Sequence, residues 1–132
     1  MTPEEQKDRA REFLEVFEDP DPVKFETMVS SDFEYRVMGS AKGFGHPIRK
    51  EGMRGFAGQL KQALPKGLNF RFGPVISEGS HVSLQAESDT EAANGKKYQN
   101  RYHFYIRFDG DKIAEVREYC DTDHVREVFG PF

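Results

Sequence analysis

The amino-acid sequence predicts one α+β domain over residues 1–132, in which helices cover one face of a largely antiparallel sheet. Apolar residues recur at helical spacing up to residue 64 and at every second position between residues 68 and 108. The 132 residues are the size of one ordinary domain and can bury a core without disulfides or metal. No repeat, linker or low-complexity segment divides the chain.

The first half of the chain predicts three helices. Thr2 and Glu5 have the spacing of a capping box, and Pro3 suits the first helical turn. Pro20 ends this helix, because proline cannot continue the hydrogen-bond ladder, and Pro22 restarts a short second one. The residues expected to face the core are Ala10, Phe13, Leu14 and Phe17, followed by Phe25, Met28 and Val29.

A strand and a glycine-rich loop separate the second helix from the third. Residues 32–39, DFEYRVMG, predict the strand, and residues 39–47, GSAKGFGHP, predict a flexible connection or lid. This loop lacks the Gly-Lys-Ser/Thr ending of a phosphate-binding loop. The third helix is expected from Ile48 to Leu64, where Pro65 follows. Its apolar side would carry Met53, Phe56, Leu60 and Leu64.

The second half of the chain predicts strands. Alternation is clear in residues 68–72, 81–87 and 98–108, and Asn94-Gly95 is a strong turn signal before the longest of these runs. The inward residues of that longest run would be Tyr98, Asn100, Tyr102, Phe104, Ile106 and Phe108. Residues 122–130, TDHVREVFG, predict one or two helical turns.

Residues 114–121, AEVREYCD, form a charged strand whose inward face has to be chosen between two phases. A two-residue turn at Asp109-Gly110 would turn three charged side chains inward. A three-residue turn with a bulge would instead bury Ala114, Val116, Glu118 and Cys120. The second phase buries one charge in place of three, and burying an unpaired charge costs several kcal/mol. The second phase is therefore favoured, and it makes Glu118 and Asn100 polar exceptions on an apolar inner face.

Composition and charge limit the possible partners. The 19 basic and 23 acidic residues form no basic stripe, so nucleic acid is not expected as a partner. No apolar run reaches membrane-spanning length, so no membrane partner is expected.

Cys120 is the only cysteine, which favours a reducing compartment and a cytoplasmic location. The four histidines lack metal-ligand spacing, so neither a metal nor another cofactor is expected. Twelve Phe and five Tyr are compatible with a ligand cavity or with a core that simply uses aromatic rings.

The chain resembles the SnoaL-like, ketosteroid-isomerase-like branch of the nuclear transport factor two superfamily. The resemblance rests on the order of the elements, on RVMGS at the end of the first strand, and on YQNRYHFYIRFDGDKIAEVREYCDT near the C-terminus. The resemblance implies a cone, in which a strongly curved sheet of nuclear transport factor two or cystatin-like type wraps the helices and leaves an apolar pocket. It also implies a homodimer through the outer sheet face. Members of the family include isomerases, polyketide cyclases, epoxide hydrolases, dehydratases and binding proteins.

The resemblance carries over catalytic residues only in part. In ketosteroid isomerases the catalytic groups are an Asp base, a Tyr that binds the oxyanion and a second carboxylic acid that donates to it. Their positions fall at Arg36, near Phe13 and at Phe104 respectively, so that mechanism is not expected. The carboxylate of limonene-epoxide-hydrolase-like members falls at Glu118, with Asn100 and Tyr102 near its partners. Polyketide-cyclase-like members place an Asp or His in this region.

Glu118 is therefore the first catalytic candidate, because burial disfavours an ionised carboxylate and so prepares it for acid–base work. The alternative is a structural Glu held by Arg36 or by a tyrosine hydroxyl. Asp121 is the second catalytic candidate, with His103 behind it, although Asp121 also suits a helix cap. Arg36 is expected to pair with Glu118 or a substrate carboxylate, or else with a surface acid. The residues expected to line the pocket and bind substrate are Tyr35, Arg36, Asn100, Tyr102, Phe104, Val116, Cys120, Phe13 and Phe56.

The expected function is that of a small enzyme using acid–base chemistry on a small apolar molecule, of isomerase, cyclase, hydrolase or dehydratase type. The alternative is a non-catalytic protein that carries or senses a small hydrophobic ligand.

Overall fold

The computed structural model covers residues 1–132 and consists of helices and one six-stranded sheet. The helices are α1 (Pro3–Leu14), α2 (Pro22–Met28), α3 (Met53–Ala63) and α4 (Thr122–Phe129), with short 3-10 turns η1 (Glu15–Phe17) and η2 (Lys50–Gly52). The strands are β1 (Val29–Val37), β2 (Ile48–Arg49), β3 (Arg71–Glu78), β4 (His81–Glu91), β5 (Lys97–Asp109) and β6 (Lys112–Cys120).

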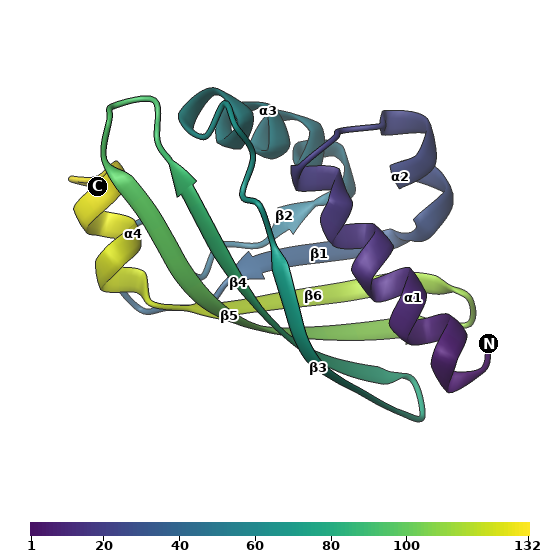
Figure 1. The fold of residues 1–132 in the computed structure, drawn as a ribbon. Coiled ribbons are helices and arrows are strands. Elements are labelled where there is room, and N and C mark those ends of the chain that lie inside the picture. Colours follow the sequence, from purple (N-terminus) through teal and green to yellow (C-terminus); the bar gives the residue numbers. More distant parts are fainter.

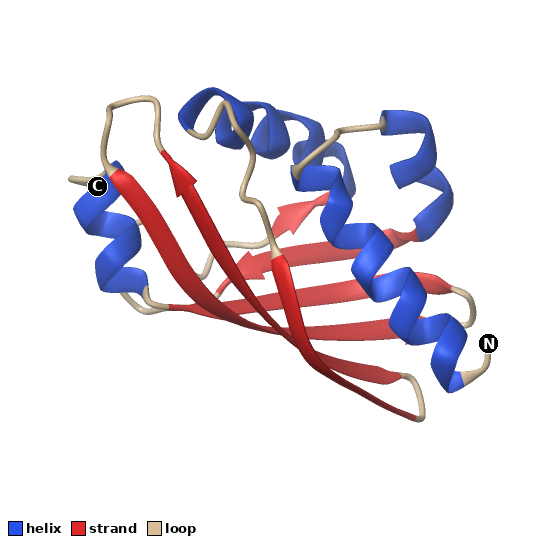
Figure 2. Cartoon of the chain, viewed as in Figure 1, coloured by secondary structure: helices blue, strands red, loops and turns tan.

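The sheet is curved and unclosed, and its strand order is β2-β1-β6-β5-β4-β3. All neighbouring pairs are antiparallel except β1 and β6, which run parallel. Helices α1, α2 and α3 lie on one side of the sheet, and α4 packs against the start of β5 (Figures 1 and 2). The predicted α+β class, with a curved and largely antiparallel sheet around the N-terminal helices, is confirmed.

The core forms where the inner faces of helices and sheet meet. All the residues predicted to face inward on α1, α2 and β5 are buried. Aromatic rings dominate this core: the ring of Phe13 lies 5.8 Å from that of Phe33 and 6.4 Å from that of Tyr35. Full burial of such a side chain contributes roughly 1.5–3 kcal/mol, so the seven buried phenylalanines do much to stabilise a chain that is otherwise polar.

The helix ends follow the predicted capping chemistry. The side chain of Thr2 accepts a hydrogen bond from Glu5 N, and Thr2 N donates in return to the Glu5 carboxylate. Asp21 caps α2. The third helix begins later than predicted, because Ile48 and Arg49 pair with β1 as a two-residue strand. A long-range strand pairing thus overrides the helical pattern at this end.

Strand β6 adopts the predicted phase by a different route. The turn after β5 contains two residues, since Asp109 pairs with Lys112, so the predicted three-residue turn is wrong. The extra residue is Ala114, because Phe108 pairs with Ile113 while Arg107 pairs with Glu115. This bulge buries both Ile113 and Ala114 and then keeps Val116 and Glu118 on the inner face.

The strand predicted over residues 68–72 overlaps the observed one only at its end: β3 starts at Arg71 and continues to Glu78. Pro74 is tolerated inside it because β3 is an edge strand and is bulged there, with Gly73 and Pro74 lying opposite the single residue Gln85. The bulge bends the edge strand, and bending of this kind contributes to the curvature of the sheet.

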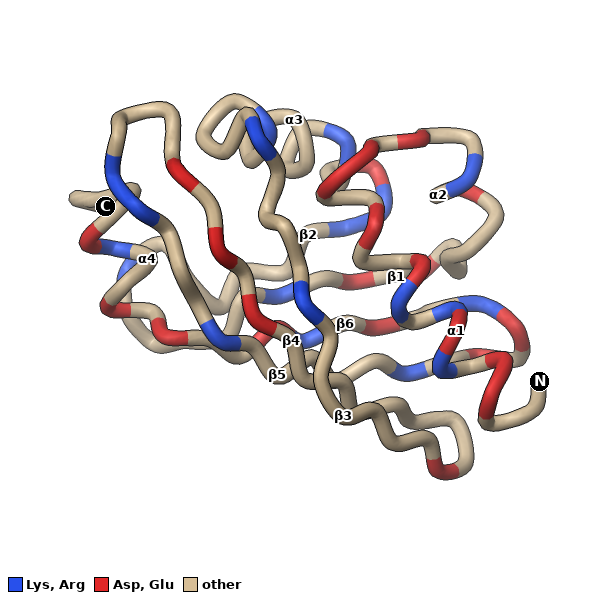
Figure 3. Tube along the Cα trace, viewed as in Figure 1, with Lys and Arg blue, Asp and Glu red and all other residues tan.

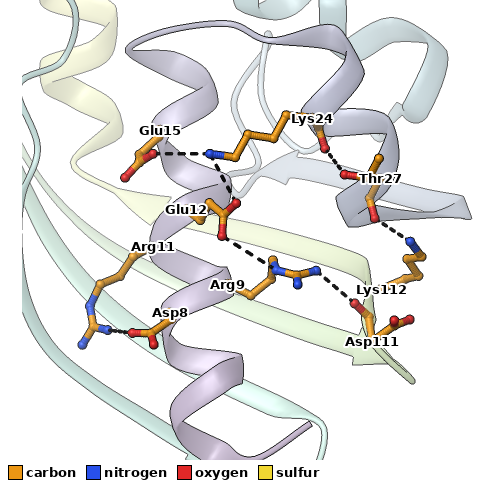
Figure 4. Close-up of polar contacts among 9 residues, drawn as sticks. All are labelled: Asp8, Arg9, Arg11, Glu12, Glu15, Lys24, Thr27, Asp111 and Lys112. Carbon is orange, nitrogen blue, oxygen red and sulfur yellow. Dashed lines mark hydrogen bonds and ion pairs between the residues drawn. The ribbon is translucent and has the colours of Figure 1, made fainter.

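Charged residues cover the outside of the fold and tie its parts together. Acidic residues along β4 lie beside basic residues along β5 (Figure 3), for example Asp89 beside Lys97 at 3.5 Å. At the other end, Lys24 of α2 pairs with Glu12 of α1 at 3.2 Å, and Lys112 donates to the carbonyl of Thr27 at 2.5 Å (Figure 4). These contacts dock α2 between α1 and the β5–β6 turn. No helix of this structure combines the length and apolar character that crossing a bilayer requires.

Candidate functional site

A cavity of about 370 Å³ lies between the inner face of the sheet, α3 and α4. Most of its lining is aromatic or aliphatic, with Phe56 from α3, Phe70 before β3, and Phe129 from α4. The glycine-rich loop reaches its edge through Phe44, whose ring packs at 5.7 Å against the ring of the C-terminal Phe132. The predicted loop therefore lies at the cavity, and its role as a lid remains a prediction.

Glu118 is the one carboxylate that lines this cavity. It lies on β6 opposite Phe104 of β5 and next to Val37 of β1, so neighbouring strands flank it on both sides. The hydroxyl of Tyr35 donates a hydrogen bond of 2.5 Å to its Oε1. Of the two partners considered for a structural Glu, the tyrosine hydroxyl is the one observed.

Burial raises the pKa of Glu118, although the hydrogen bond from Tyr35 and the neighbouring thiol of Cys120 partly offset the rise. The pKa of Tyr35 is raised well above its usual value by burial and by the charge of Glu118. Burial and Glu118 also raise the pKa of the Cys120 thiol, so Cys120 remains protonated and is a poor nucleophile. The site therefore contains one carboxyl group with raised proton affinity among groups that keep their protons.

Asn100 is buried on the inner face, as predicted, and its amide holds the junction between β6 and α4. Its Nδ2 donates to the carbonyl of Asp121 at 3.1 Å, and its Oδ1 accepts from the N–H of Asp121 at 3.0 Å. The same Nδ2 donates to the hydroxyl of Tyr98 at 3.0 Å. Asn100 thus positions Tyr98 and the start of α4, and it does not itself line the cavity.

Asp121 and Arg36, two other sequence candidates, lie away from the cavity. The carboxylate of Asp121 caps α4 by accepting from His124 N, and the residue is exposed. Arg36 follows the inward Tyr35 on β1, so it points to the outer face, where it pairs with Glu34 at 3.6 Å. The expected contact between Arg36 and Glu118 is therefore absent, because successive strand residues point to opposite faces. His103 also faces outward and contacts Ser83.

The remaining candidates divide between cavity wall and core. Phe56 and Tyr102 line the cavity beside Glu118. Four others lie fully buried behind the wall: Phe13, Tyr35, Phe104 and Val116. Cys120 is partly buried next to Glu118.

Sequence reasoning did not single out several residues of the wall. Tyr98 and Phe70 line the cavity, as do Val125 and Phe129 of α4. The inward phase of Tyr98 and the i, i+4 spacing of the α4 pair were visible signals. Their meeting at one cavity depends on the curvature that brings α4 over the start of β5.

A second cavity of about 390 Å³ lies between α2 and the start of α3. Its polar lining includes the exposed pair Lys50–Glu26 at 3.0 Å, and none of the predicted site residues lines it. No cluster of His, Cys, Asp and Glu side chains is arranged to hold a metal ion. The cavity beside Glu118 is therefore the better candidate site.

Comparison with known proteins identifies similar sequences and folds. The profile of a family described as the SnoaL-like domain matches residues 10–116. No curated protein is similar enough in sequence to count as a match. Among solved structures, a candidate SnoaL-like polyketide cyclase from Jannaschia sp. CCS1 has a TM-score of 0.81 at 13% identity, covering 98% of this chain and 95% of its own.

Two further structures show how little the fold alone says about chemistry. An NTF2-like protein of unknown function from Burkholderia pseudomallei K96243 has a TM-score of 0.82 at 15% identity, covering 99% of this chain and 100% of its own. A de novo designed protein with a curved β-sheet has a TM-score of 0.70 at 20% identity, covering 97% of this chain and 94% of its own. At these identities the likeness shows a shared fold, and function has to be argued from the site.

Proposed function

Because this chain belongs to the SnoaL-like domain family, we propose that it is an enzyme that performs acid–base chemistry on a small apolar molecule held in the inner cavity. Glu118 is the acid or base. The observation that carries the proposal is its position: one carboxyl group, with its pKa raised by burial, lines a largely apolar cavity of about 370 Å³.

The surroundings of Glu118 suit proton transfer. Tyr35 donates to Oε1 and fixes the carboxyl group, and the weakly donating Cys120 thiol is its other hydrogen-bond partner. No lysine or arginine lines the cavity beside Glu118. A raised pKa brings the carboxyl group closer to neutral pH, where a group that both takes and returns a proton is most effective.

Proton transfer in both directions fits this arrangement. In the ionised form, Glu118 takes a proton from a carbon next to a carbonyl group or from a water that attacks an electrophilic carbon. In the neutral form, it returns the proton to another carbon or to a leaving oxygen. Isomerisation, cyclisation, epoxide hydrolysis and dehydration all consist of such steps, and the apolar wall limits competing reactions with water.

The test begins with a panel of epoxides, enones and hydroxy-ketones, screened by thermal shift because a ligand that binds only the folded state raises its stability. Compounds that bind are then incubated with the wild type and with Glu118→Gln, which retains an oxygen that accepts from Tyr35. The expected result is retained binding with turnover reduced by about 100-fold or more. Glu115→Gln is the matched control, since Glu115 lies on the outer face of the same strand and pairs with Arg107 and Arg117.

The alternative function, a carrier or sensor of small hydrophobic molecules, predicts a different outcome. Ligands would bind both wild type and Glu118→Gln with similar affinity, and neither would change the ligand. Conversion of a bound compound at equal rates by both proteins would also reject Glu118 as the catalytic group.

We further propose that the partner of this chain is a second copy, docked on the outer face of the sheet. Ile76 and Tyr119 leave 64% and 43% of their surfaces exposed there, between side chains of both charges. Sedimentation should show a dimer that Tyr119→Glu and Ile76→Glu weaken. Val23→Glu should leave it intact, since Val23 is also exposed, at 76%, but lies on α2. A monomeric wild type at 100 µM (about a hundred times a micromolar Kd) would reject this proposal.

The free thiol of Cys120 also supports a reducing compartment, and we propose a cytoplasmic location. Cell fractionation that recovers the protein outside the cytoplasm would reject it.

A further inference from the structure

Three hydroxyl groups form a chain along the wall of the cavity. The hydroxyl of Tyr102 lies 2.9 Å from that of Tyr98 and 2.9 Å from Oγ of Ser88. Tyr98 and Tyr102 line the cavity, whereas Ser88 lies behind them and is 1% exposed. Burial raises the pKa of Tyr98 and of Tyr102, so both hydroxyls keep their protons.

The Tyr98 end of the chain is fixed by Asn100. The amide of Asn100 faces both the N–H and the carbonyl of Asp121, so only one orientation of its oxygen and nitrogen satisfies both groups. In that orientation Nδ2 donates to the oxygen of Tyr98 at 3.0 Å. Packing holds the ring, because His124 stacks on it at 5.4 Å and Phe129 packs at 5.0 Å. The Tyr98 oxygen is thus an acceptor from Asn100, and its own proton has to point elsewhere.

Counting protons shows that one of them lacks an acceptor. Three hydroxyl groups carry three protons, and the chain contains two oxygen–oxygen contacts, each of which uses one proton. These hydroxyls donate no hydrogen bond to any other group of the protein, and at the far end Ser88 Oγ accepts from Asn100 N at 3.3 Å. The Tyr102 hydroxyl donates to that of Tyr98 and so uses its only proton, which leaves Ser88 Oγ as the donor in its contact with Tyr102. The surplus proton therefore lies on Tyr98, at the cavity wall.

We propose that the cavity binds an electrically neutral, ring-sized ligand whose oxygen accepts this surplus proton, such as a ketone, an ether or an epoxide. The proposal deepens the proposed function and shares its cavity, but it does not depend on Glu118 being catalytic. Charge supports neutrality: no lysine or arginine lines the cavity, Glu118 already supplies one acid, and the only other ionisable side chain besides the tyrosines is the exposed His46. A ligand carboxylate in the buried part of the cavity would therefore lack a cationic partner.

The first experiment compares three rigid probes of one shape: indane, 1-indanone and indane-1-carboxylate. Affinities are measured by calorimetry at pH 7. We expect 1-indanone to bind about fivefold more tightly than indane, which corresponds to one net hydrogen bond of about 1 kcal/mol. The carboxylate should bind at least about tenfold more weakly than the ketone. Equal affinities for indane and indanone, tighter binding of the carboxylate, or no binding of any probe would each overturn the proposal.

The second experiment identifies the donor. Tyr98→Phe/Tyr102→Phe removes both hydroxyls at the wall and should abolish the preference for the ketone. Ser88→Ala is the control: it removes one proton and one contact together, so a surplus proton remains on a tyrosine and the preference should persist. Loss of the preference in Ser88→Ala alone, with the double variant unchanged, would overturn the proton count.

A direct readout covers the case in which the double variant does not fold. Hydrogen bonding should displace the infrared carbonyl band of 1-indanone bound to the wild type to a lower frequency than in an alkane. The displacement should persist in Glu118→Met, which has no proton to donate. An undisplaced band in the wild type, or a displacement lost in Glu118→Met, would assign no role to the hydroxyl chain. Either result would leave the turnover test of Glu118→Gln unaffected, so the two proposals can fail separately.

Discussion

Replacing Asn100 by leucine tests whether its amide holds the end of the sheet together. Leucine has a similar branched shape but lacks the amide that bonds the N–H and carbonyl of Asp121, the N–H of Arg101 and the hydroxyl of Tyr98. At about 1 kcal/mol for each of these four hydrogen bonds, the free energy of unfolding should fall by about 4 kcal/mol. The loss comes mainly from groups left unpaired near the base of α4, where water reaches only part of the surface.

Urea unfolding followed by circular dichroism measures this change, and hydrogen exchange of the amides of α4 shows whether the helix loosens first. Gln99→Ala is the control, because the exposed neighbour makes no side-chain hydrogen bond and should change stability by less than about 0.5 kcal/mol. A loss below about 1 kcal/mol for Asn100→Leu, with unchanged exchange in α4, would refute the reasoning. It would mean that water replaces the amide at little cost.

Two further predictions concern Glu118 and a pair of glycines. Burial raises the pKa of Glu118 in the folded state, so the folded protein holds this proton to higher pH than the unfolded chain. Stability should therefore fall as pH rises from about 4.3, the unfolded value, through the folded pKa. Glu118→Gln should remove this decline, because glutamine does not ionise. Urea unfolding measures the free energy of unfolding of both proteins at pH 4 and pH 8, and the variant should be more stable relative to the wild type at pH 8 than at pH 4. The same difference in stability at both pH values would contradict the prediction. Gly67→Ala should destabilise by more than about 1 kcal/mol, since Gly67 has φ +80° and its added Cβ would collide with the Glu18 carboxylate. Gly55→Ala in α3 should raise the free energy of unfolding by about 0.5–1 kcal/mol, because nothing lies within 4 Å of its added Cβ. Thermal unfolding of the two variants measures both changes, and equal changes in Tm would contradict the predicted difference between the two glycines.

The fold was predictable because the period of the apolar residues differs so clearly between the two halves of the chain. The inward residues of α1 and β5 each follow one period without interruption, and all of them are buried. The phase of β6 was predictable for an energetic reason, since only one phase avoids burying several charges. The position of the bulge was not predictable from the sequence. Ile113 and Ala114 are both apolar, so a bulge at either residue would bury both side chains at similar cost.

The site was predictable only where it depends on a single strand. Glu118 and Tyr102 follow directly from the inward phases of β6 and β5, and both line the cavity. Arg36 was expected at the same place because it lies near the end of β1, but the alternation of side chains sends it to the other face. Asp121 comes one residue after Cys120, the last residue of β6, and its carboxylate caps the start of α4.

The sequence by itself determined the class of fold, the inner face of each long strand and the presence of one acid on that face, because these depend on local periodicity and on the cost of burying charge. Only the tertiary structure decided which groups surround that acid. The hydroxyl of Tyr35, the chain from Ser88 to Tyr98 and the cover provided by α4 come from segments far apart in sequence. Their meeting depends on the curvature of the sheet, a sum of bulges, twists and packing that no local pattern encodes.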